Sequence, residues 1–473
     1  MNDLAGRLAA IAGADRVAVD AATRRAFGRD ALGRGHAPDV VVTPANTAEI
    51  AAIARLCHDT HTPLVVRGAG TGYTGGSVPI RGGVVVSMAR FDRILDIDVD
   101  NLLAVVQPNV ITGDLHDAVE ARGLFYPPDP ASLAECAIGG NVAECAGGPR
   151  AFKYGTTRRY VLALEAVLPT GEIIRTGSKA VKNVAGYALT DLLVGSEGTL
   201  AILTEITVRL IPLPPQRRTL SATYASVEAA ARAVSAIVAG GVVPAVLELI
   251  DRPSLEAVAA HLGRPMAPPG TEALLLLEVN GHAVAVDDEV GRTAAACESA
   301  GATSLIAATT AAERDALWEA RRVLSYALRS VAPRKINHDV VVPRGRVPAL
   351  YALVDAIRRQ YDLRIAAFGH AGDGNIHVNL LVDPADGAEM ARATAAEHAL
   401  FSGVVALEGA ITGEHGVGFA KAVHLGVQLA PAEIALMARV KHAFDPHGVL
   451  NPGKMWDTTA ADLAGLDDGG MRR

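Results

Sequence analysis

The chain has 473 residues, of which 50% are apolar and 20% charged, and a formal net charge of −7. This length allows two or three domains with complete hydrophobic cores. Both signs of charge are interspersed, so we expect neither nucleic acid nor an anionic membrane as a partner. No apolar stretch of about 18 residues predicts a membrane span. The N-terminus also lacks the pattern of a secretory signal.

The cysteines are few and show no CxxC spacing: Cys57, Cys136, Cys145 and Cys297. This usage fits a reducing cytoplasm and argues against a structural zinc or an iron–sulfur cluster held by this chain. We expect Cys136 and Cys145 to be buried apolar residues. The expected location is the cytoplasm, with peripheral attachment to the inner membrane left open.

Roughly the first 210 residues are rich in glycine and in short apolar runs. The first 16 residues predict an amphipathic helix. Residues 160–177, YVLALEAVLPTGEIIRTG, predict a hairpin around a Thr-Gly turn. The proline-rich stretch IPLPPQRR at 211–218 predicts a domain boundary.

Helices and strands then alternate. Residues 226–241 predict a helix that stops at glycine, and 245–251 and 272–281 predict strands. A helix over about 311–330 begins with Thr310 and Glu313 in capping-box spacing. Near the C-terminus, 431–444 predict another helix, and we expect the last dozen or so residues to be disordered.

Residues 67–76 form a glycine-rich loop in which Gly70, Gly72 and Gly75 match GxGxxG after a predicted strand. A Rossmann site needs a helix directly after this loop. Here the sequence continues SVPIRGGVVVSM, whose glycines and proline oppose a helix. We therefore expect exposed backbone N–H groups that bind an anion without a helix. Further glycine-rich segments, spread over about 130 residues, suit an elongated ligand shaped like a flavin dinucleotide.

Residues 369–379, GHAGDGNIHVN, predict a hairpin with His377 and Asn379 on one strand face. His370 ends the first strand, so the turn brings two imidazoles together at a possible metal site. The candidate third ligand is Glu414 in TGEHGVG. From spacing alone, such a histidine pair is more often unrelated surface or core residues, and Glu414 with His415 fits a helix cap equally well.

Five segments in this order carry a resemblance: RGAGTGYTGGSVP, PPDPAS, IGGNVAECAGGPRAFKYGTTRRYV, KNVAGYALTDLLVGSEGTLAILTE and TGEHGVG. Together they resemble the FAD-linked oxidase/dehydrogenase family of the vanillyl-alcohol-oxidase type (FAD-binding type 4), near the D-lactate, glycolate and D-2-hydroxyglutarate dehydrogenases. The resemblance implies an α+β fold. Its parts would be a two-subdomain FAD-binding domain of the PCMH type (1–212), an α/β substrate-binding cap with the metal-binding hairpin (213–411), and a short C-terminal helical segment returning to the flavin (412–473).

The resemblance also implies a set of FAD contacts. Because no histidine lies in the first loop, the flavin should be non-covalent. The implied contacts are Arg67, Gly68, Ala69, Gly70, Thr71, Gly72, Thr74, Gly75 and Gly76 around the diphosphate, Pro128, Asp129 and Ser132 in PPDPAS, Gly139, Gly140, Asn141, Gly147 and Gly155 near the isoalloxazine and ribityl groups, Glu197, Gly198 and Ile202 near the adenine, and Asn451 from the C-terminus.

For the metal, the resemblance implies His370, His377 and Glu414 as ligands, with zinc the first choice and manganese, cobalt or iron open. His415 would be the general base. Arg321 and Ser325 would bind the substrate carboxylate, although an arginine there fits a solvated helix face equally well. Lys335 would be a second cation, and Asn379 would meet the distal end of the substrate.

The expected reaction is oxidation of a D-2-hydroxy acid to the 2-oxo acid, with hydride transfer to flavin N5 and metal stabilisation of the alkoxide. D-lactate and D-2-hydroxyglutarate are the first candidates, followed by D-malate and glycolate. Alternatives are an oxidase or synthase of the same fold, and the flavin subunit of a glycolate or lactate oxidase complex with an iron–sulfur partner. Quinone, cytochrome, electron-transfer flavoprotein and oxygen remain open as acceptors, and a homodimer is plausible.

Overall fold

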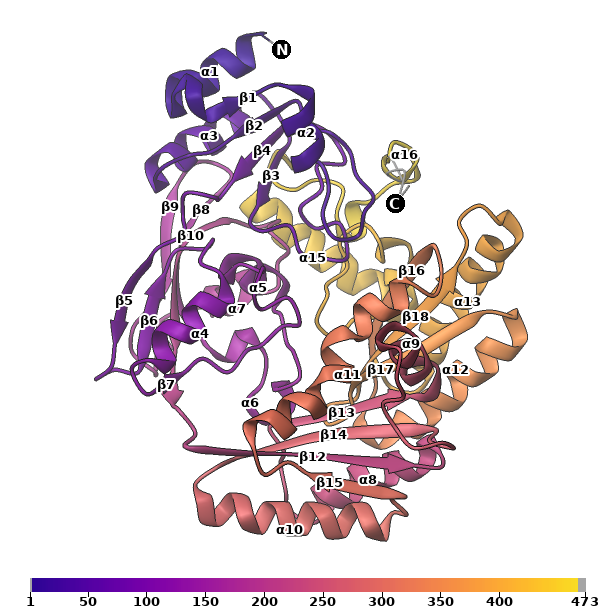
Figure 1. Ribbon diagram of the computed structural model, residues 1–473. Helices are drawn as coiled ribbons and strands as arrows, with labels where there is room; N and C mark the ends of the chain where they lie inside the picture. The colour runs from indigo at the N-terminus through magenta and orange to yellow at the C-terminus, as the bar shows by residue number, and fades with distance from the viewer. Residues whose placement is uncertain (1, 467–473) are drawn as a thin grey trace. The chain divides into compact units, whose positions relative to one another are not determined.

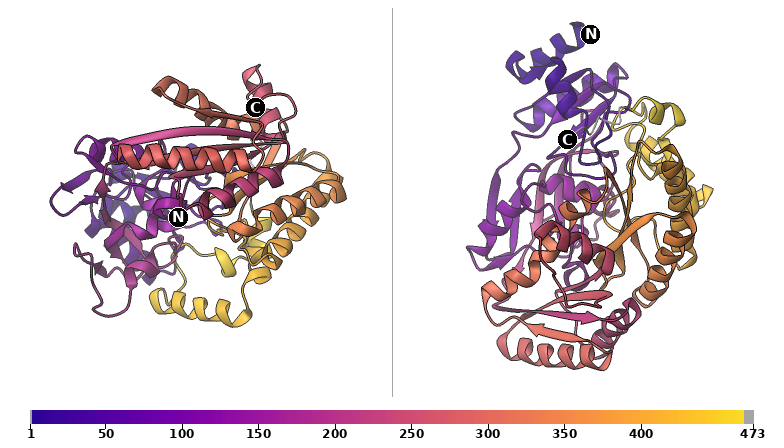
Figure 2. Two further views of the ribbon diagram at one scale, coloured as in Figure 1. Left: turned by 90° about the horizontal axis from the view of Figure 1, so that it is seen from below. Right: turned by 45° about the vertical axis from the view of Figure 1, so that its right-hand side comes forward.

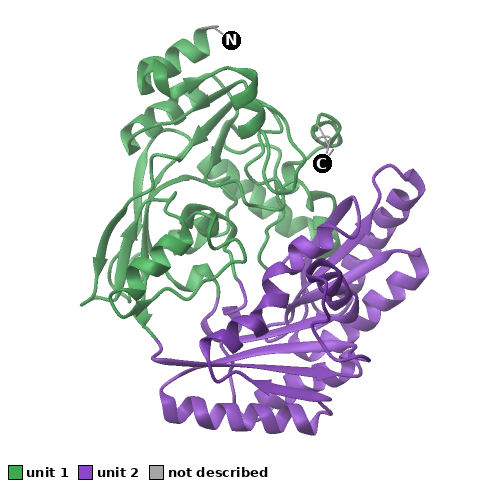
Figure 3. Cartoon of the chain, in the orientation of Figure 1, with its two compact units in different colours: residues 1–147, 156–213, 414–473 green, residues 148–155, 214–413 purple. Residues whose placement is uncertain are grey.

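The computed structural model describes residues 2–466 and divides the chain into two compact units (Figure 3). Unit 1 comprises residues 1–147, 156–213 and 414–473, and unit 2 comprises 148–155 and 214–413. The chain passes from unit 1 to unit 2 within the proline-rich stretch, at Leu213 and Pro214. The C-terminal segment is part of unit 1, whereas the short segment 148–155 belongs to unit 2.

The first sheet of unit 1 has four strands in the order β1–β2–β4–β3 (Figure 1). Helix α3 packs its apolar face, including Ile50 and Ile53, into the same core as this sheet. It begins where the Asn46 side chain accepts the Glu49 N–H, which satisfies one free donor of the first turn. The elements of this part are α1 (Asn2–Ala12), η1 (Ala14–Arg16), β1 (Val17–Ala18), α2 (Ala21–Phe27), β2 (Val40–Val42), α3 (Thr47–Asp59), β3 (Leu64–Arg67) and β4 (Val84–Ser87).

The glycine-rich loop follows β3, and no helix lies between Arg67 and β4. Strand β4 instead pairs in parallel with both β2 and β3. The exclusion of a Rossmann dinucleotide site is therefore confirmed, because the helix that would hold a diphosphate at its N-terminus does not exist here.

The second sheet of unit 1 is antiparallel, with five strands in the order β5–β6–β10–β8–β9. The hairpin predicted around the Thr-Gly turn is confirmed as β8 and β9. A small pair, β7 with β11, lies apart from it. The elements are β5 (Ile94–Asp98), β6 (Leu103–Val106), α4 (Thr112–Glu120), β7 (Leu124–Phe125), α5 (Ile138–Glu144), η2 (Thr157–Arg159), β8 (Val161–Val167), β9 (Ile173–Gly177), α7 (Leu189–Leu193), β10 (Ile202–Arg209) and β11 (Ile211–Pro212).

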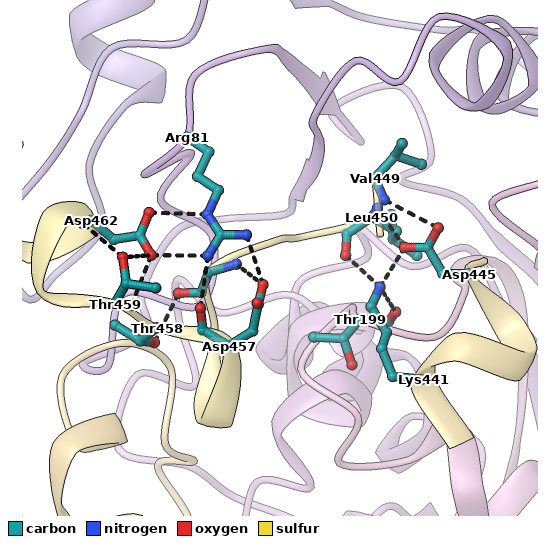
Figure 4. Close-up of polar contacts among 11 residues, drawn as sticks. Arg81, Thr199, Lys441, Asp445, Val449, Leu450, Asp457, Thr458, Thr459 and Asp462 are labelled. Carbon is teal, nitrogen blue, oxygen red and sulfur yellow. Dashed lines mark hydrogen bonds and ion pairs between the residues drawn. The ribbon is translucent and has the colours of Figure 1, made fainter. Parts of the chain in front are cut away.

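The C-terminal segment of unit 1 is held to the rest of the unit by two polar clusters (Figure 4). In one, Lys441 donates to the carbonyl of Thr199 at 2.7 Å, and the buried Asp445 accepts from Lys441 and from the backbone N–H groups of Val449 and Leu450. In the other, Arg81 binds Asp457 and Asp462. The segment contains η4 (Ala422–His424), α14 (Leu425–Gln428), α15 (Pro431–Phe444), η5 (Met455–Asp457) and α16 (Ala460–Ala464).

Unit 2 is built on one antiparallel sheet of seven strands, in the order β15–β12–β14–β13–β17–β18–β16. Figure 2 gives two further views of the sheet and its helices. The strands are β12 (Gln216–Tyr224), β13 (Val246–Asp251), β14 (Ala273–Gly281), β15 (Ser304–Ala307), β16 (Arg334–Val341), β17 (Arg364–His370) and β18 (Asn375–Val382). The helices are α6 (Ala151–Tyr154), α8 (Val227–Ala239), α9 (Arg252–Leu262), α10 (Ala283–Ser299), α11 (Ala311–Arg329), η3 (Arg344–Arg346), α12 (Val347–Tyr361) and α13 (Gly387–Ala406).

Helices cover both faces of this sheet: α9 and α11 pack on one face, and α8, α10, α12 and α13 on the other. The core under α9 and α11 includes Ile250, Leu276, Phe368 and Leu381 from the strands. Because side chains alternate along a strand, the residues two apart from these point to the same face. This face, called the α9/α11 face below, carries the polar residues of interest.

Several predicted elements are confirmed, among them the capping box of α11, in which the Thr310 and Glu313 side chains each bond the other's backbone N–H. Cys136 is buried as expected, but Cys145, which takes a left-handed conformation (φ 54°) at the end of α5, is only half buried. Part of the tail expected to be disordered forms α16, and residues 467–473 lie outside the described part. No helix within residues 2–466 is long and apolar enough to cross a membrane.

Candidate functional site

The glycine-rich loop of unit 1 leaves its backbone open at several positions. Gly70 and Gly75 have positive φ (74° and 81°), which L-residues rarely adopt. A Cβ added to Gly68 would meet nothing closer than 3.6 Å, and one on Gly72 nothing closer than 3.9 Å. The predicted loop residues Ala69, Thr71 and Gly76 lie in the same turn. A ligand can therefore approach the N–H groups here, as a diphosphate cradle requires.

Arg67 anchors the start of this loop. One of its terminal nitrogens donates to the carbonyl of Arg29, and the guanidinium lies over the Phe27 ring at 5.6 Å. Burial lowers the pKa of Arg67, and the charge of Asp30 partly opposes this. Arg67 therefore contacts other residues of unit 1 at the edge of the predicted diphosphate cradle.

Helix α5 flanks the loop from end to end. Ala137, just before the helix, lies 3.6 Å from the Cβ position of Gly68, and Glu144 at its end lies 2.7 Å from that of Gly76. Gly140 has no atom within 4 Å of an added Cβ, so a ligand can lie against it. Gly139 instead packs against Pro108, and the Asn141 amide donates to Thr112 at 2.7 Å.

The turn containing His415 lies against the same loop, within unit 1. The His415 ring is 5.5 Å from the Tyr73 ring, and the Thr74 hydroxyl donates to the His415 carbonyl at 3.2 Å. A Cβ on Gly418 would lie 2.0 Å from the Thr74 carbonyl, so this close approach requires glycine. The predicted base therefore lies beside the predicted diphosphate loop.

Glu197 and Asn451 hold this arrangement from two sides. The Glu197 carboxylate accepts the N–H groups of Val417 and Gly418 at 2.8 and 2.6 Å, and burial raises its pKa. The Asn451 amide donates to the carbonyls of Gly76 and Glu197 at 2.8 and 2.7 Å. Both were predicted as flavin contacts; the structure shows that their side chains join the loop to the C-terminal segment.

The other predicted flavin contacts are distributed over the two units, most of them in unit 1. The Pro128 carbonyl pairs with His116 at 2.9 Å, and Asp129, Ser132 and Gly198 lie in turns of unit 1. The Ile202 side chain belongs to the hydrophobic core, so only its backbone is left for a ligand. Gly155 is in unit 2, where the neighbouring Lys153 and Tyr154 bond Asn280. The Gly147 backbone meets the Glu414 carboxylate, since an added Cβ would lie 2.5 Å from it.

In unit 2, the predicted hairpin of His370 and His377 is confirmed as β17 and β18. His377 pairs in register with Phe368, and His370 with Asn375, so both imidazoles point to the α9/α11 face. Their ring centroids are 5.2 Å apart at 88°. Both side chains are buried. Two imidazoles converging in this way suit a divalent cation.

A carboxylate that sequence reasoning missed, Glu248 of β13, lies beside them. It is fully buried and bonds the Nδ1 of His370 and the Nε of Arg321. Burial alone would raise the pKa of Glu248, but its pairing with His370 and Arg321 outweighs burial and lowers it. The ionised carboxylate can only accept, so Nδ1 of His370 carries the proton in this bond, and Nε2 is the atom that could ligate a metal.

Asp339 of β16, also missed by sequence reasoning, pairs with the hairpin and binds the two residues that precede Glu414 in the chain. It pairs in register with His377, and its Oδ1 lies 4.0 Å from His377 Nδ1. The Asp339 carboxylate accepts from Thr412 and from the Gly413 N–H, at 3.0 and 2.9 Å. Gly413 is the last residue of unit 2, so Glu414 starts one peptide bond beyond this anchor.

Arg321 and Ser325 lie one turn apart on α11, as predicted. The guanidinium carbon of Arg321 is 5.1 Å from the centre of the Phe368 ring. Lys335 of β16 donates to the Ser325 hydroxyl at 2.8 Å. Burial lowers the pKa of Lys335 to about 8, and the charges of Arg329 and Arg321 act in the same direction. Two cations and a hydroxyl therefore share the α9/α11 face with the histidines.

Asn379 lies on this face but inside the sheet. It is completely buried, accepts from Asn337 at 2.7 Å and donates to the carbonyls of Ala366 and His377. The Asn379 side chain is therefore held by bonds within the sheet, and its contact with the distal end of the substrate stays a prediction. Asn337, whose side-chain amide binds Asn379, lies on β16 two residues after Lys335. His338, the next residue on β16, points to the opposite face and pairs with Glu397 of α13 at 2.9 Å.

The missed residues had a weak signal in the sequence. Glu248 is the lone charge inside the apolar run AVLELI, and Asp339 precedes VVV. A charged residue inside an otherwise buried strand is informative, because such residues are rarely buried without a partner. The partners of Glu248 could not be predicted, because α11 and β17 are distant from β13 in the sequence.

Two family models match the chain. The model described as "FAD binding domain" matches residues 38–177, and the one described as "FAD linked oxidases, C-terminal domain" matches residues 213–455. The chain belongs to the family of FAD-linked oxidases. FAD is therefore its cofactor, and the open backbone at Gly68, Gly72 and Gly140 fits such a ligand.

Curated relatives agree. The chain is 45% identical over 421 residues to the glycolate oxidase subunit GlcD of Bacillus subtilis, covering 89% of each chain. It is 35% identical over 425 residues to a D-lactate dehydrogenase of Anaerostipes hadrus, covering 88% of this chain and 89% of that one. The protein is an FAD-linked oxidoreductase.

Solved structures show the same fold. A substrate-bound p-cresol methylhydroxylase aligns with a TM-score of 0.80 at 18% identity, covering 96% of both chains. A 4-ethylphenol oxidase of Gulosibacter chungangensis aligns with a TM-score of 0.78 at 20% identity, covering 97% of both. The expected α+β fold of the PCMH, or vanillyl-alcohol-oxidase, type is confirmed.

We predict that Gly140→Leu lowers flavin content. Leucine suits a helix, and its Cβ meets no protein atom within 4 Å, so we expect its side chain to occupy the space of the ligand. The measurement is FAD released per chain on denaturation. Gly6→Leu is the matched control, because Gly6 also lies in a helix with open space around its Cβ. Equal flavin content in both variants would place the flavin away from α5.

Proposed function

We propose that the protein oxidises a small D-2-hydroxy acid to the 2-oxo acid, with FAD as hydride acceptor and a divalent metal beside it. One observation carries this proposal: on the α9/α11 face of unit 2, a pair of buried histidines shares its surroundings with Arg321 and Lys335. A 2-hydroxy acid has a hydroxyl that a metal can bind and a carboxylate that cations can bind, so it matches both halves of this face.

The metal ligands we propose are His370, His377 and Glu414. The donor set fits zinc first, with manganese, cobalt or iron as alternatives. The bond between Glu248 and His370 Nδ1 supports the proposal, since metal-binding histidines commonly donate their second nitrogen to a carboxylate. A bound metal would lower the pKa of the substrate hydroxyl and stabilise the alkoxide.

The chain's own residues then bind and orient the substrate. We propose that Arg321, Lys335 and Ser325 hold its carboxylate, which orients the α-carbon. His415 removes the hydroxyl proton; its place beside Tyr73 and Thr74 of the glycine-rich loop supports this role. Relatives named for glycolate and D-lactate favour these substrates, and D-2-hydroxyglutarate and D-malate complete the test set.

His370→Ala is expected to lose bound metal and to lower turnover of D-lactate at least about a hundredfold, because a ligand is removed. Metal content is measured by mass spectrometry and turnover with a dye acceptor, across D-lactate, glycolate, D-2-hydroxyglutarate and D-malate with their L forms. His338→Ala is the control, since His338 faces the other side of the sheet. Normal turnover of His370→Ala would contradict the metal mechanism.

The KM for the hydroxy acid should rise above pH 8, by up to about tenfold per pH unit. Lys335 is protonated below its pKa of about 8 and loses its charge as the pH rises, so it then attracts the substrate carboxylate less. KM is measured between pH 6.5 and 10. Lys335→Arg keeps its charge throughout this range, and its KM should stay flat above pH 8. The same rise in Lys335→Arg would assign the effect to another group.

A second candidate is the flavin subunit of an oxidase complex, favoured by the relative named a glycolate oxidase subunit. In that case the tagged chain, purified from its own organism, should bring with it a partner that carries an iron–sulfur cluster. The isolated chain should then reduce an artificial dye but need the partner to reduce quinone. Quinone reduction by the isolated chain at the full rate would exclude this candidate.

A further inference from the structure

Glu248 stands in the middle of the sheet of unit 2. Its strand, β13, has β14 on one side and β17 on the other, and Glu248 pairs in register with His370. The carboxylate has no solvent exposure. Removing such a charge from water is unfavourable, so its partners must compensate for the lost hydration.

The two carboxylate oxygens have separate partners. Oε1 pairs with Nδ1 of His370, and Oε2 accepts from Nε of Arg321. On the strand side, the bond sets the tautomer and the ring orientation of a proposed metal ligand. On the helix side, it uses the inner nitrogen of the guanidinium and neither of the terminal ones.

We propose that Glu248 is a positioning residue that couples metal affinity to binding of the substrate carboxylate. The inference rests on the proposed function, because it assigns His370 to the metal and Arg321 to the carboxylate. It adds that the buried Glu248 side chain holds both His370 and Arg321, so a change at Glu248 loosens both residues at once. Glu248 itself does not touch the substrate.

Glu248→Gln tests this coupling. An amide carries no charge, so its oxygen accepts more weakly from whichever of His370 and Arg321 it meets, and its NH2 opposes the other; the holds on both residues are therefore weakened. We expect the Zn²⁺ dissociation constant to rise about ten- to a hundredfold. The KM for D-lactate at saturating Zn²⁺ should rise about tenfold. Zn²⁺ affinity is measured on the chelator-treated flavoprotein with a competing indicator, and therefore does not depend on turnover.

Three further variants separate the explanations. Glu278→Gln is the matched control: Glu278 is also buried, lies on the adjacent strand β14 and bonds Thr219 instead of the site. Arg321→Gln should raise KM but change Zn²⁺ affinity less than about threefold, because Glu248 still holds His370. Glu248→Asp keeps the charge with a shorter reach, so it should fold and show both effects more weakly.

The outcomes are distinct. A fall in Zn²⁺ affinity together with a rise in KM in Glu248→Gln, both absent in Glu278→Gln, supports the coupling. A change in one without the other, in Glu248→Gln or Glu248→Asp, overturns it. If His370→Ala loses zinc while Glu248→Gln binds zinc and D-lactate normally, the inference fails and the proposed function stands. If His370→Ala retains zinc, the proposed metal site itself fails.

Discussion

The ion pair of Glu248 with Arg321 is the interaction around which the polar face of unit 2 is organised. A buried carboxylate is tolerated only with strong hydrogen-bond donors, and here one comes from strand β17 and the other from helix α11. Because both oxygens are occupied, the strand and the helix are held relative to each other. The stacking of Arg321 on Phe368 then follows from the same placement.

The register of the neighbouring strands supplies the rest of this face. Antiparallel pairing sets His377 opposite both Phe368 and Asp339, and the side chains of paired residues point the same way. A shift of one residue would turn every polar side chain of β18 to the opposite face. Such a shift would place these polar side chains against α13 and would remove Leu381 from the hydrophobic core under α9 and α11. The packing of that core therefore opposes the shift.

In unit 1 the corresponding constraint is close backbone approach. The C-terminal turn reaches the glycine-rich loop so nearly that Gly418 meets the Thr74 carbonyl, and Gly75 meets the Phe419 ring, with no room for a Cβ. Glu197 and Asn451 then satisfy the polar groups of both segments. Here the glycines permit the contact and the hydrogen bonds maintain it.

Local sequence patterns were enough to predict the hairpin around His370 and His377, the capped helix α11, and a glycine loop without a following helix. Each depends on residues a few positions apart, which is the range over which turn chemistry and periodicity act. The sequence also indicated the family, through five short segments in order. That Glu248 holds Arg321 and His370, and that Glu197 and Asn451 brace the C-terminal turn, is visible in the folded chain alone. These contacts join residues 73, 122 and more than 200 positions apart, and side-chain pairing over such distances follows from packing, which local pattern does not encode.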